Sequence, residues 1–510
     1  MYKQGTEGAF VHYVCSEWKK LVNSRGVIIP RRIGKNRLIT QKELFMDSLY
    51  REFKPPFGIR DKLGYLFGDF GNDFTFILSS SFLLKFYTDV MGVAPWIVGL
   101  VMTFARFVDG FTDVTMGRIA DRGRVTPSGK FKPWIKRMAA PVAISSFLIY
   151  QSAFANSAMW FKISWLVITY ILWGSIFYTS INIPYGSMAS SISADPQDRQ
   201  SLSTFRTMGS TLAGVIVGAG IPIFAYDRVG ENTVLNGPRF TLIAGVFSIL
   251  AVLCYMVCYL LSTERVVSDT SGRSQPGVGA MLGSAVRNRA LISIIVGSVV
   301  MLLAQLTMQS MSNYIYPNYY GNVTAQSVST LAMMVGMIVA AALAKPLSNK
   351  FGKAEISAAS NLLSAAICIL LFAIRPNNVW VYVLINLVSW FGLGVFAMVS
   401  WALITDVIDD AELRNGRRED GTIYALYSFS RKLGQALSAG LTGALLSAIG
   451  YSDKTAFDEG VLRGIYDIST LVPALGFGML ALILWFWYPL HKRKVEENVE
   501  RLRIKHSSDG

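Results

Sequence analysis

Apolar runs long enough to cross a lipid bilayer follow one another from Leu63 to near the end of the 510-residue chain. A membrane-spanning helix needs about 20 mostly apolar residues. Charged residues make up only 16% of the chain, whereas soluble domains carry roughly 25%. The sequence therefore predicts an all-α integral membrane protein with about twelve transmembrane helices. The runs lie at 63–89, 94–117, 133–155, 160–187, 206–226, 240–262, 289–314, 326–346, 355–374, 379–408, 422–450 and 465–490.

Basic residues gather in alternate loops between these runs. The loops after the second, eighth, tenth and last runs are rich in Lys and Arg, while those after the first, third and seventh are short and nearly uncharged. Because Lys and Arg are retained on the cytoplasmic side, we expect a multi-pass protein of the cell (inner) membrane with both termini in the cytoplasm. The net charge of +15 is therefore explained by membrane topology. We expect no nucleic-acid partner, since the sequence contains no separate basic domain.

A linker rich in Ser, Gly and charge divides the runs into two sets of six. We expect one six-helix bundle over 61–262, the cytoplasmic linker over 263–288, a second bundle over 289–490 and a cytoplasmic tail over 491–510. The loops GRIADRGR and KPLSNKFGK, which follow the second and eighth runs, are weakly alike. This repeat indicates two pseudo-symmetric halves, which is a common plan among transporters.

The first 60 residues are polar and contain no apolar run of signal-peptide length. Met46 offers a second plausible start of translation. We therefore interpret residues 1–45 as a disordered tail or a start-site artefact rather than a functional arm.

Two carboxylates on one face of the second run, Asp109 and Asp113, are the most informative charges in the chain. A charge at bilayer depth costs at least a few kcal/mol, so each needs a partner or a function. Residues four apart share a helix face, and two like charges in low dielectric need a counter-cation. The pair is therefore a candidate seat for a proton or Na⁺. The alternative is a purely structural ion pair with Arg106, which can neutralise one of the two.

Further polar side chains in the runs are candidates for contact with a substrate. A buried lysine such as Lys432 pairs with a carboxylate of the first two runs or with an anionic substrate. Tyr427, Ser428 and Gln435 lie near its face of the eleventh run and are donors for hydroxyl groups. The fourth run adds Tyr178, Thr179 and Asn182, and Arg206 opens the fifth.

Signals for soluble chemistry are weak. All three histidines lie outside the apolar runs, which leaves carboxylates as the expected proton carriers. The segment GRVTPSGKF has the wrong spacing for a phosphate-binding loop, and no histidine-based metal site or nucleophile elbow is present. We expect neither an enzyme nor a bound cofactor or metal, and no obligate protein partner.

Several long motifs resemble the glycoside–pentoside–hexuronide:cation symporters, a branch of the major facilitator superfamily. They are FGDFGNDF, FYTDVMG, ARFVDGFTDVTMGRIADR, GKFKPW, INIPYGSM and RREDGTIYALYSFSRKLGQA. The resemblance extends from about Asp61 to the last run. It is nearest in pattern to glucuronide and xyloside permeases and more distant from the melibiose permease.

The resemblance implies a cation site. The family's coupling aspartates in the second run match Asp109 and Asp113, and a threonine on the cation side matches Thr179. The melibiose permease has an asparagine between the two aspartates that helps to hold Na⁺. Thr112 stands there in this chain, which favours H⁺ as the coupling ion.

The resemblance also implies a sugar site. The family's aspartate that contacts sugar hydroxyls matches Asp73, and its basic residues in the fifth and eleventh runs match Arg206 and Lys432. The melibiose permease has a sugar-binding aspartate in the fourth run where this chain has Asn182. The resemblance thus implies a glycoside, pentoside or hexuronide and leaves its identity open.

The sequence as a whole predicts a cation-coupled sugar symporter of the major facilitator fold. The candidate substrate contacts are Asp73, Arg106, Tyr178, Asn182, Arg206, Tyr427, Ser428 and Lys432, and the candidate cation contacts are Asp109, Thr112, Asp113 and Thr179. Three alternatives remain: the same fold carrying a lysolipid or other amphiphile, a sugar sensor without transport, and a membrane enzyme for lipid-linked sugars. The last would need a large catalytic loop, and the loops are short.

Overall fold

The computed structural model describes residues 55–123, 125–266, 288–415 and 420–508. All of these residues belong to one compact unit, Pro55–Gly510. The predicted N-terminal extension before residue 55, with Met46, and most of the predicted linker lie outside the described residues.

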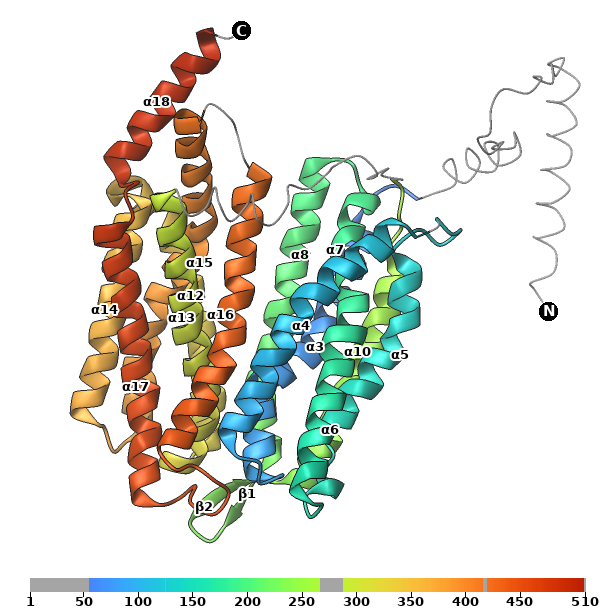
Figure 1. The fold of residues 1–510 in the computed structure, drawn as a ribbon, viewed down its shortest axis with the longest axis vertical. Helices are drawn as coiled ribbons and strands as arrows, with labels where there is room; N and C mark the ends of the chain where they lie inside the picture. Colours follow the sequence, from blue (N-terminus) through green and yellow to red (C-terminus); the bar gives the residue numbers. More distant parts are fainter. Residues whose placement is uncertain (1–54, 124, 267–287, 416–419, 509–510) are drawn as a thin grey trace, which may run out of the picture. The chain divides into compact units, whose positions relative to one another are not determined.

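Each predicted run corresponds to a long helix, several of which include a π-helical turn (Figure 1). In the first half these are α3 (Ile59–Asp89), α4 (Pro95–Asp121), α5 (Lys132–Ile149), α6 (Met159–Ile171) with η2 (Leu172–Tyr178) and α7 (Thr179–Ile192), α8 (Pro196–Val215) with η3 (Ile216–Gly220) and α9 (Ile221–Ala225), and α10 (Gly237–Leu261). In the second half they are α12 (Arg289–Tyr314) with η4 (Ile315–Tyr319), α13 (Val323–Phe351), α14 (Lys353–Ile374), α15 (Val379–Asn415), α16 (Asp420–Ala448), and α17 (Glu459–Leu482) with η5 (Ile483–Trp487). A short turn η1 (Ser152–Phe154) follows α5, and α18 (Lys492–Ser508) ends the described chain.

Eight of these helices are long and apolar enough to cross a membrane by length and composition alone. The remaining long helices α3, α4, α5 and α16 are more polar. Three of them, α3, α4 and α16, carry the intramembrane charges singled out from the sequence. These charges account for part of the polarity of the three helices.

Side chains fix where several helices begin. The side-chain oxygens of Asn236, Asn288 and Asn322 each accept a hydrogen bond from the backbone N–H three residues later. Asp195 accepts one from the N–H of Gln197. These bonds satisfy backbone donors that the first turn of a helix leaves without partners, and so the short polar loops place the helix starts.

The helices form two sets that follow the halves of the sequence (Figure 1). In the first set, α3 packs against α8 and α10, and α10 packs against α5; in the second, α12 packs against α16 and α17, and α14 against α15 and α17. The most extensive contact between the sets joins α4 to α16. The major facilitator fold expected from the sequence is confirmed.

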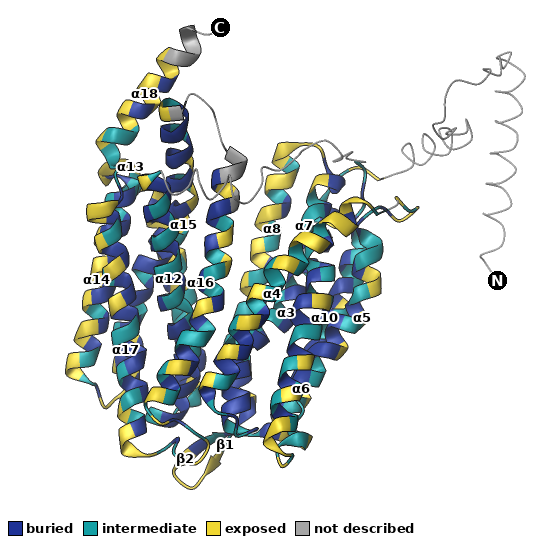
Figure 2. Cartoon of the chain, in the orientation of Figure 1, coloured by how far each residue is buried: buried dark blue, intermediate teal, exposed yellow. Residues whose placement is uncertain are grey.

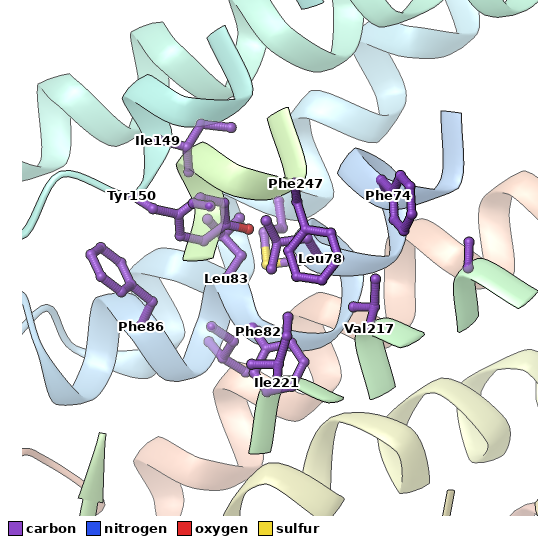
Figure 3. Packing of buried hydrophobic residues seen from close by; sticks show 14 of the residues in the cluster. Phe74, Leu78, Phe82, Leu83, Phe86, Ile149, Tyr150, Val217, Ile221 and Phe247 are labelled. Atoms are coloured by element: carbon purple, nitrogen blue, oxygen red, sulfur yellow. The ribbon is translucent and has the colours of Figure 1, made fainter. Parts of the chain in front are cut away.

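Aromatic side chains fill the core of the first half around α3 (Figure 3). The ring of Phe86 lies 5.4 Å from that of Phe240 and 5.3 Å from that of Tyr150, and Phe74 lies 5.2 Å from Phe247. The outward faces of the helices are exposed although apolar (Figure 2). This pattern suits a protein whose surroundings are lipid, because lipid satisfies apolar surface as well as a core does.

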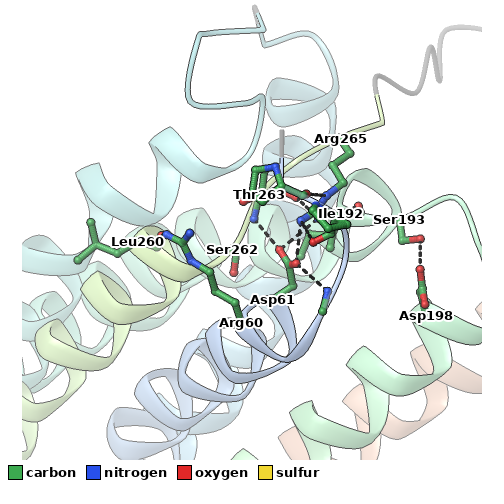
Figure 4. A network of polar contacts seen from close by, with 12 residues as sticks. Arg60, Asp61, Ile192, Ser193, Asp198, Leu260, Ser262, Thr263 and Arg265 are labelled. Carbon is green, nitrogen blue, oxygen red and sulfur yellow. Dashed lines mark hydrogen bonds and ion pairs between the residues drawn. The ribbon is translucent and has the colours of Figure 1, made fainter. Parts of the chain in front are cut away.

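A polar network closes the first half at the end where the linker leaves (Figure 4). The Arg265 guanidinium donates to both oxygens of Asp61, at 2.8 and 3.2 Å, and to the carbonyl of Ile192. Asp61 also accepts from the backbone N–H of Thr263. The start of α3, the end of α7 and the chain after α10 are thereby joined.

One element was not expected from the apolar pattern. The loop before α10 forms an antiparallel hairpin of β1 (Tyr226–Val229) and β2 (Asn232–Leu235). Gly230 in its turn has φ +66°, a conformation that glycine adopts without a steric penalty.

Close packing of α8 on α3 yields a test of the fold. A Cβ at Gly209 would collide with the carbonyl oxygen of Leu66, whereas one at Gly214 would make ordinary contact with Ile77. We expect Gly209→Ala to lower stability by about 1–3 kcal/mol, since overpacking forces the helices apart. Gly214→Ala on the same helix is the matched control and should be neutral or slightly stabilising. Thermal unfolding of the two detergent-purified variants measures this difference. Equal melting temperatures would contradict the close packing of α8 on α3.

Candidate functional site

A cavity of about 710 Å³ lies between the two halves, lined by residues of α3, α4, α8, α12, α13, α15 and α16. A smaller cavity of about 180 Å³ adjoins it and shares the side chains of Phe76, Arg106 and Gln435. The remaining residues of the smaller cavity are Asp109, Asp113, Tyr178, Thr179, Asn182 and Lys432. The structure thus brings together most of the polar residues singled out from the second, fourth and eleventh runs.

The carboxylate of Asp109 has two side-chain partners, one guanidinium group and one hydroxyl. Its Oδ2 accepts a hydrogen bond from Nη1 of Arg106 at 3.1 Å, and its Oδ1 accepts one from Oγ of Ser175 at 2.6 Å. The guanidinium of Arg106 also lies 4.9 Å from the ring centre of Phe76. The ion pair with Arg106 that the sequence suggested is therefore formed at this carboxylate.

Asp113 is held in the same way, but its cation comes from the other half. Its Oδ1 accepts a hydrogen bond from Oγ1 of Thr179 at 3.0 Å, and its Oδ2 forms an ion pair with Nζ of Lys432. The Lys432 side chain is half exposed and that of Asp113 is largely buried. This ion pair joins α4 of the first half to α16 of the second.

Matched spacing on two neighbouring helices explains the arrangement. Asp109 and Asp113 are four residues apart on α4, and their donors Ser175 and Thr179 are four residues apart where η2 passes into α7. Side chains at this spacing point to the same side of a helix. The π-helical turn η2 precedes the second donor, and such turns are frequent at functional sites.

Thr112 lies between the two aspartates but does not contact their carboxylates. Its hydroxyl donates to the backbone carbonyls of Val108 and Asp109, at 3.3 and 3.2 Å. This local bond within the helix is usual for threonine. The side chain expected from the sequence to join the cation site is therefore turned toward its own backbone.

Asp73 and Arg206 were both expected to line the sugar site, and only Asp73 lines a cavity in the structure. Asp73 lines the large cavity beside Ser210. Arg206 instead donates from Nε to Oδ1 of the buried Asp69 at 3.0 Å and lies over the ring of Tyr185. It lines neither cavity. A nearer carboxylate, one helical turn from Asp73, holds it.

Tyr427 and Ser428 also lie away from both cavities. Tyr427 is fully buried in the core of the second half, packed edge-on against the ring of Trp401 at 4.9 Å. Lys432 and Gln435, three residues apart on the same helix, do line the smaller cavity. The helix of the eleventh run, α16, thus directs toward the site the face that carries Lys432 and Gln435. Tyr427, which was expected at the site, lies on another face.

Asn182 and Tyr178 lie where the sequence predicted, in the smaller cavity. The amide oxygen of Asn182 accepts a hydrogen bond from Asn72 at 3.4 Å, and the Tyr178 ring stacks on that of Phe76. The sequence did not single out Ser175, nor the amides Gln305 and Gln309 of α12 that line the large cavity. These side chains are uncharged, so a search of the sequence for intramembrane charges does not select them.

The two halves are bonded together at the end of the helices remote from the linker. Lys85 of α3 is 1% exposed, pairs with Asp89 at 2.7 Å and donates to Asn318 at 2.7 Å and to the hydroxyl of Tyr451 at 3.0 Å. The Tyr451 hydroxyl in turn donates to Asp89 at 2.7 Å. We call these four residues the outer cluster. The large cavity lies on the linker side of it.

The family described as MFS/sugar transport protein matches residues 64–492. The chain belongs to this family. It is a multi-pass membrane transporter of the glycoside–pentoside–hexuronide branch and not an enzyme, and membership implies cation coupling and a small, sugar-like substrate.

The sequences of individual relatives align with most of this chain. It is 30% identical over 442 residues to a glucuronide carrier protein homolog of Escherichia coli, with 86% of this chain and 94% of that one covered. It is 28% identical over 429 residues to an isoprimeverose transporter of Lactiplantibacillus pentosus, with 84% and 88% covered. An inward-facing, unoccupied crystal structure of a bacterial homolog to the human lysosomal transporter Spinster has TM-score 0.60 at 13% identity, covering 85% of this chain and 98% of that one. That last similarity shows the fold.

The outer cluster generates a second prediction. Removing Lys85 leaves Asp89 buried without its counter-charge, so Lys85→Met should lower stability by about 3–5 kcal/mol. The double variant Lys85→Met/Asp89→Asn should recover part of that loss. Arg463 and Glu459 form an exposed ion pair with the same four-residue spacing, and Arg463→Met should cost less than about 1 kcal/mol. Equal melting temperatures for Lys85→Met and Arg463→Met would show that the outer cluster does not stabilise this state.

Proposed function

We propose that this transporter couples the inward movement of a sugar to that of a cation, and that the cation is H⁺. The observation that carries the proposal is the pair of carboxylates, Asp109 and Asp113, each held by one cation and one hydroxyl beside a large cavity. The named relatives that carry a glucuronide or isoprimeverose support a sugar as cargo.

Geometry at the two carboxylates favours a proton over Na⁺. A bound metal ion needs several oxygen ligands at once. Each carboxylate here has a single hydroxyl neighbour, already has a cation of its own, and receives nothing from Thr112. A proton needs only one carboxylate oxygen.

Asp113 is the site at which we propose that coupling occurs. Its ion pair with Lys432 links the two halves at the level of the cavity. Protonation of Asp113 removes the charge that holds Lys432, which frees the ammonium group for a substrate and loosens the link between α4 and α16. Alternating access then rocks one half against the other around the cavity, and cation and sugar each favour the binding of the other.

For the sugar we propose the large cavity and its junction with the smaller one. Asp73 and Asn182 supply acceptors for hydroxyl groups, while Arg106 and Gln435 supply donors from opposite halves. Lys432, once released, would accept a carboxylated sugar. With both termini in the cytoplasm, as the loop charges indicate, the outer cluster faces outward.

Neutralising either carboxylate tests the coupling site. We expect Asp109→Asn or Asp113→Asn to abolish accumulation of sugar against a gradient in membrane vesicles, because the proton acceptor is lost, while exchange of sugar across the membrane partly survives. Glu459→Gln, which changes an exposed carboxylate at the other end of the molecule, is the control and should accumulate sugar normally. Accumulation at the wild-type level by either aspartate variant would refute the assignment.

Imposed gradients test the ion. Vesicles containing the transporter would be given pentosides, hexuronides and disaccharides under an inward H⁺ gradient or an inward Na⁺ gradient alone. We expect the H⁺ gradient to drive accumulation and the Na⁺ gradient to have no effect. Uptake driven by Na⁺ alone would make the ion assignment wrong, and binding without flux under any gradient would indicate a sensor.

A further inference from the structure

Three basic side chains surround the end of α10 on the side of the molecule where the linker leaves. They are Arg60 at the start of α3, and Lys132 and Lys136 in the first two turns of α5, and we call them the basic cluster. We propose that the basic cluster binds the head group of an anionic phospholipid. This inference concerns the lipid-facing surface of the first half and goes beyond the proposed sugar transport.

The end of α10 attracts cations from both neighbouring helices. Nη2 of Arg60 donates to the carbonyl of Leu260 at 3.0 Å, and Nζ of Lys132 donates to the carbonyl of Ser262 at 2.6 Å. Figure 4 shows the Arg60 side chain beside Leu260. The last carbonyls of a helix lack partners within the helix and carry partial negative charge. These bonds hold the two cations close together although their charges repel each other.

The aromatic ring of Tyr259 joins the third cation to the cluster. Its centre lies 4.9 Å from Nζ of Lys132 and 5.5 Å from Nζ of Lys136. The Tyr259 hydroxyl lies at hydrogen-bond distance, 3.3 Å, from that of Ser128, which fixes the position of the ring. Lys136 is exposed, and among the described residues it forms no hydrogen bond and no ion pair. Its ammonium group is therefore available to a ligand.

No carboxylate of the described residues forms an ion pair with the basic cluster. Glu264 lies near Lys132, but its two oxygens accept hydrogen bonds from three backbone N–H groups around the start of α5, at 2.7 to 2.9 Å. Asp61 is paired with Arg265. The cluster thus keeps a local excess of positive charge, and an anion would lower its free energy.

The second half provides an internal comparison. Arg289 at the start of α12 donates to two carbonyls at the end of η5, as Arg60 does at the end of α10. The lysine that begins α14, Lys353, forms an ion pair with Asp406 at 2.5 Å. The bonds to the helix end are thus repeated in both halves, but the lysine of the second half is paired with a carboxylate and those of the first half are not.

An apolar surface for acyl chains lies beside the cluster. On α5, Ile144 is 59% exposed about two turns from Lys136, and α5 packs against α10. Neither helix lines the two cavities of the candidate site. One face of α10 carries exposed apolar side chains along its length, namely Leu242, Val246, Ile249, Leu253 and Leu260. A phospholipid places its head group and its chains in this same order, from the interface into the membrane.

Charge complementarity selects the kind of phospholipid. Phosphatidylcholine carries a positive group beside its phosphate, which the basic cluster repels. Phosphatidylglycerol presents the phosphate with a neutral glycerol. Each basic residue near the membrane surface strengthens the attraction to anionic lipid by about fivefold, so three of them distinguish the two head groups.

Native mass spectrometry of the full-length protein in detergent tests the proposal, because it resolves the binding of individual lipid molecules. Dioleoyl phosphatidylglycerol and dioleoyl phosphatidylcholine would be titrated separately. We expect the first molecule of phosphatidylglycerol to bind at least about tenfold more tightly than the first of phosphatidylcholine. Equal affinities would overturn the proposal.

Paired variants locate the site. Arg60→Gln and Lys136→Gln should each weaken the first binding step of phosphatidylglycerol by about fivefold, and Lys136→Arg should retain it. Arg289→Gln and Lys345→Gln remove the corresponding arginine and an exposed lysine near the same end of the second half. These two controls should leave the affinity within about twofold. Lys136→Gln removes no hydrogen bond of the described structure, so its effect reports binding rather than folding.

The remaining outcomes identify other causes. If all four glutamine variants weaken binding equally, the lipid is attracted by the charge of the whole surface, and the basic cluster is not a site. If inorganic phosphate displaces the bound phosphatidylglycerol, the cluster binds a free anion and the proposal is likewise overturned. None of these measurements depends on sugar transport, so the proposed function stands or falls separately.

Discussion

A charge buried at membrane depth must have a partner, and this constraint organises the centre of the molecule. Asp113 of α4 is held by Lys432 of α16, so a charge of each half neutralises the other across the interface. In the proposed mechanism, the cation site and the link between the halves are therefore one and the same interaction. Any change in the charge of Asp113 acts on the packing of the halves as well as on binding.

A second charged contact between the halves, the outer cluster, lies at the end of the helices remote from the linker. Lys85 and Asp89 of α3 bond to Asn318 and Tyr451 of the second half, and these bonds close the helices beyond the cavity. Alternating access requires that the pathway is never open at both ends at once, since such a pathway would dissipate the gradient.

Much of the candidate site could be predicted, because it is built from charged residues whose transfer into a membrane costs free energy. Asp109, Asp113, Arg106 and Lys432 were all singled out by charge, and the structure gathers all of them around one small cavity. Ser175 escaped prediction because a serine in a membrane helix is inexpensive and common. Thr112 was expected at the site from its position, but a threonine within a helix satisfies its hydroxyl locally.

The sequence by itself determined the membrane environment, the number and order of the helices, and the carboxylate pair, because apolar length and the four-residue helical spacing are local properties. Only the tertiary structure decided which face of each helix meets the cavity. Tyr427 and Lys432 are five positions apart, which places them about 140° apart around the helix axis, and the packing of α16 turned the lysine toward the cavity and the tyrosine into the core. Likewise, Arg206 could serve either Asp73 or Asp69 by sequence, and the approach of α8 to α3 gave it to Asp69.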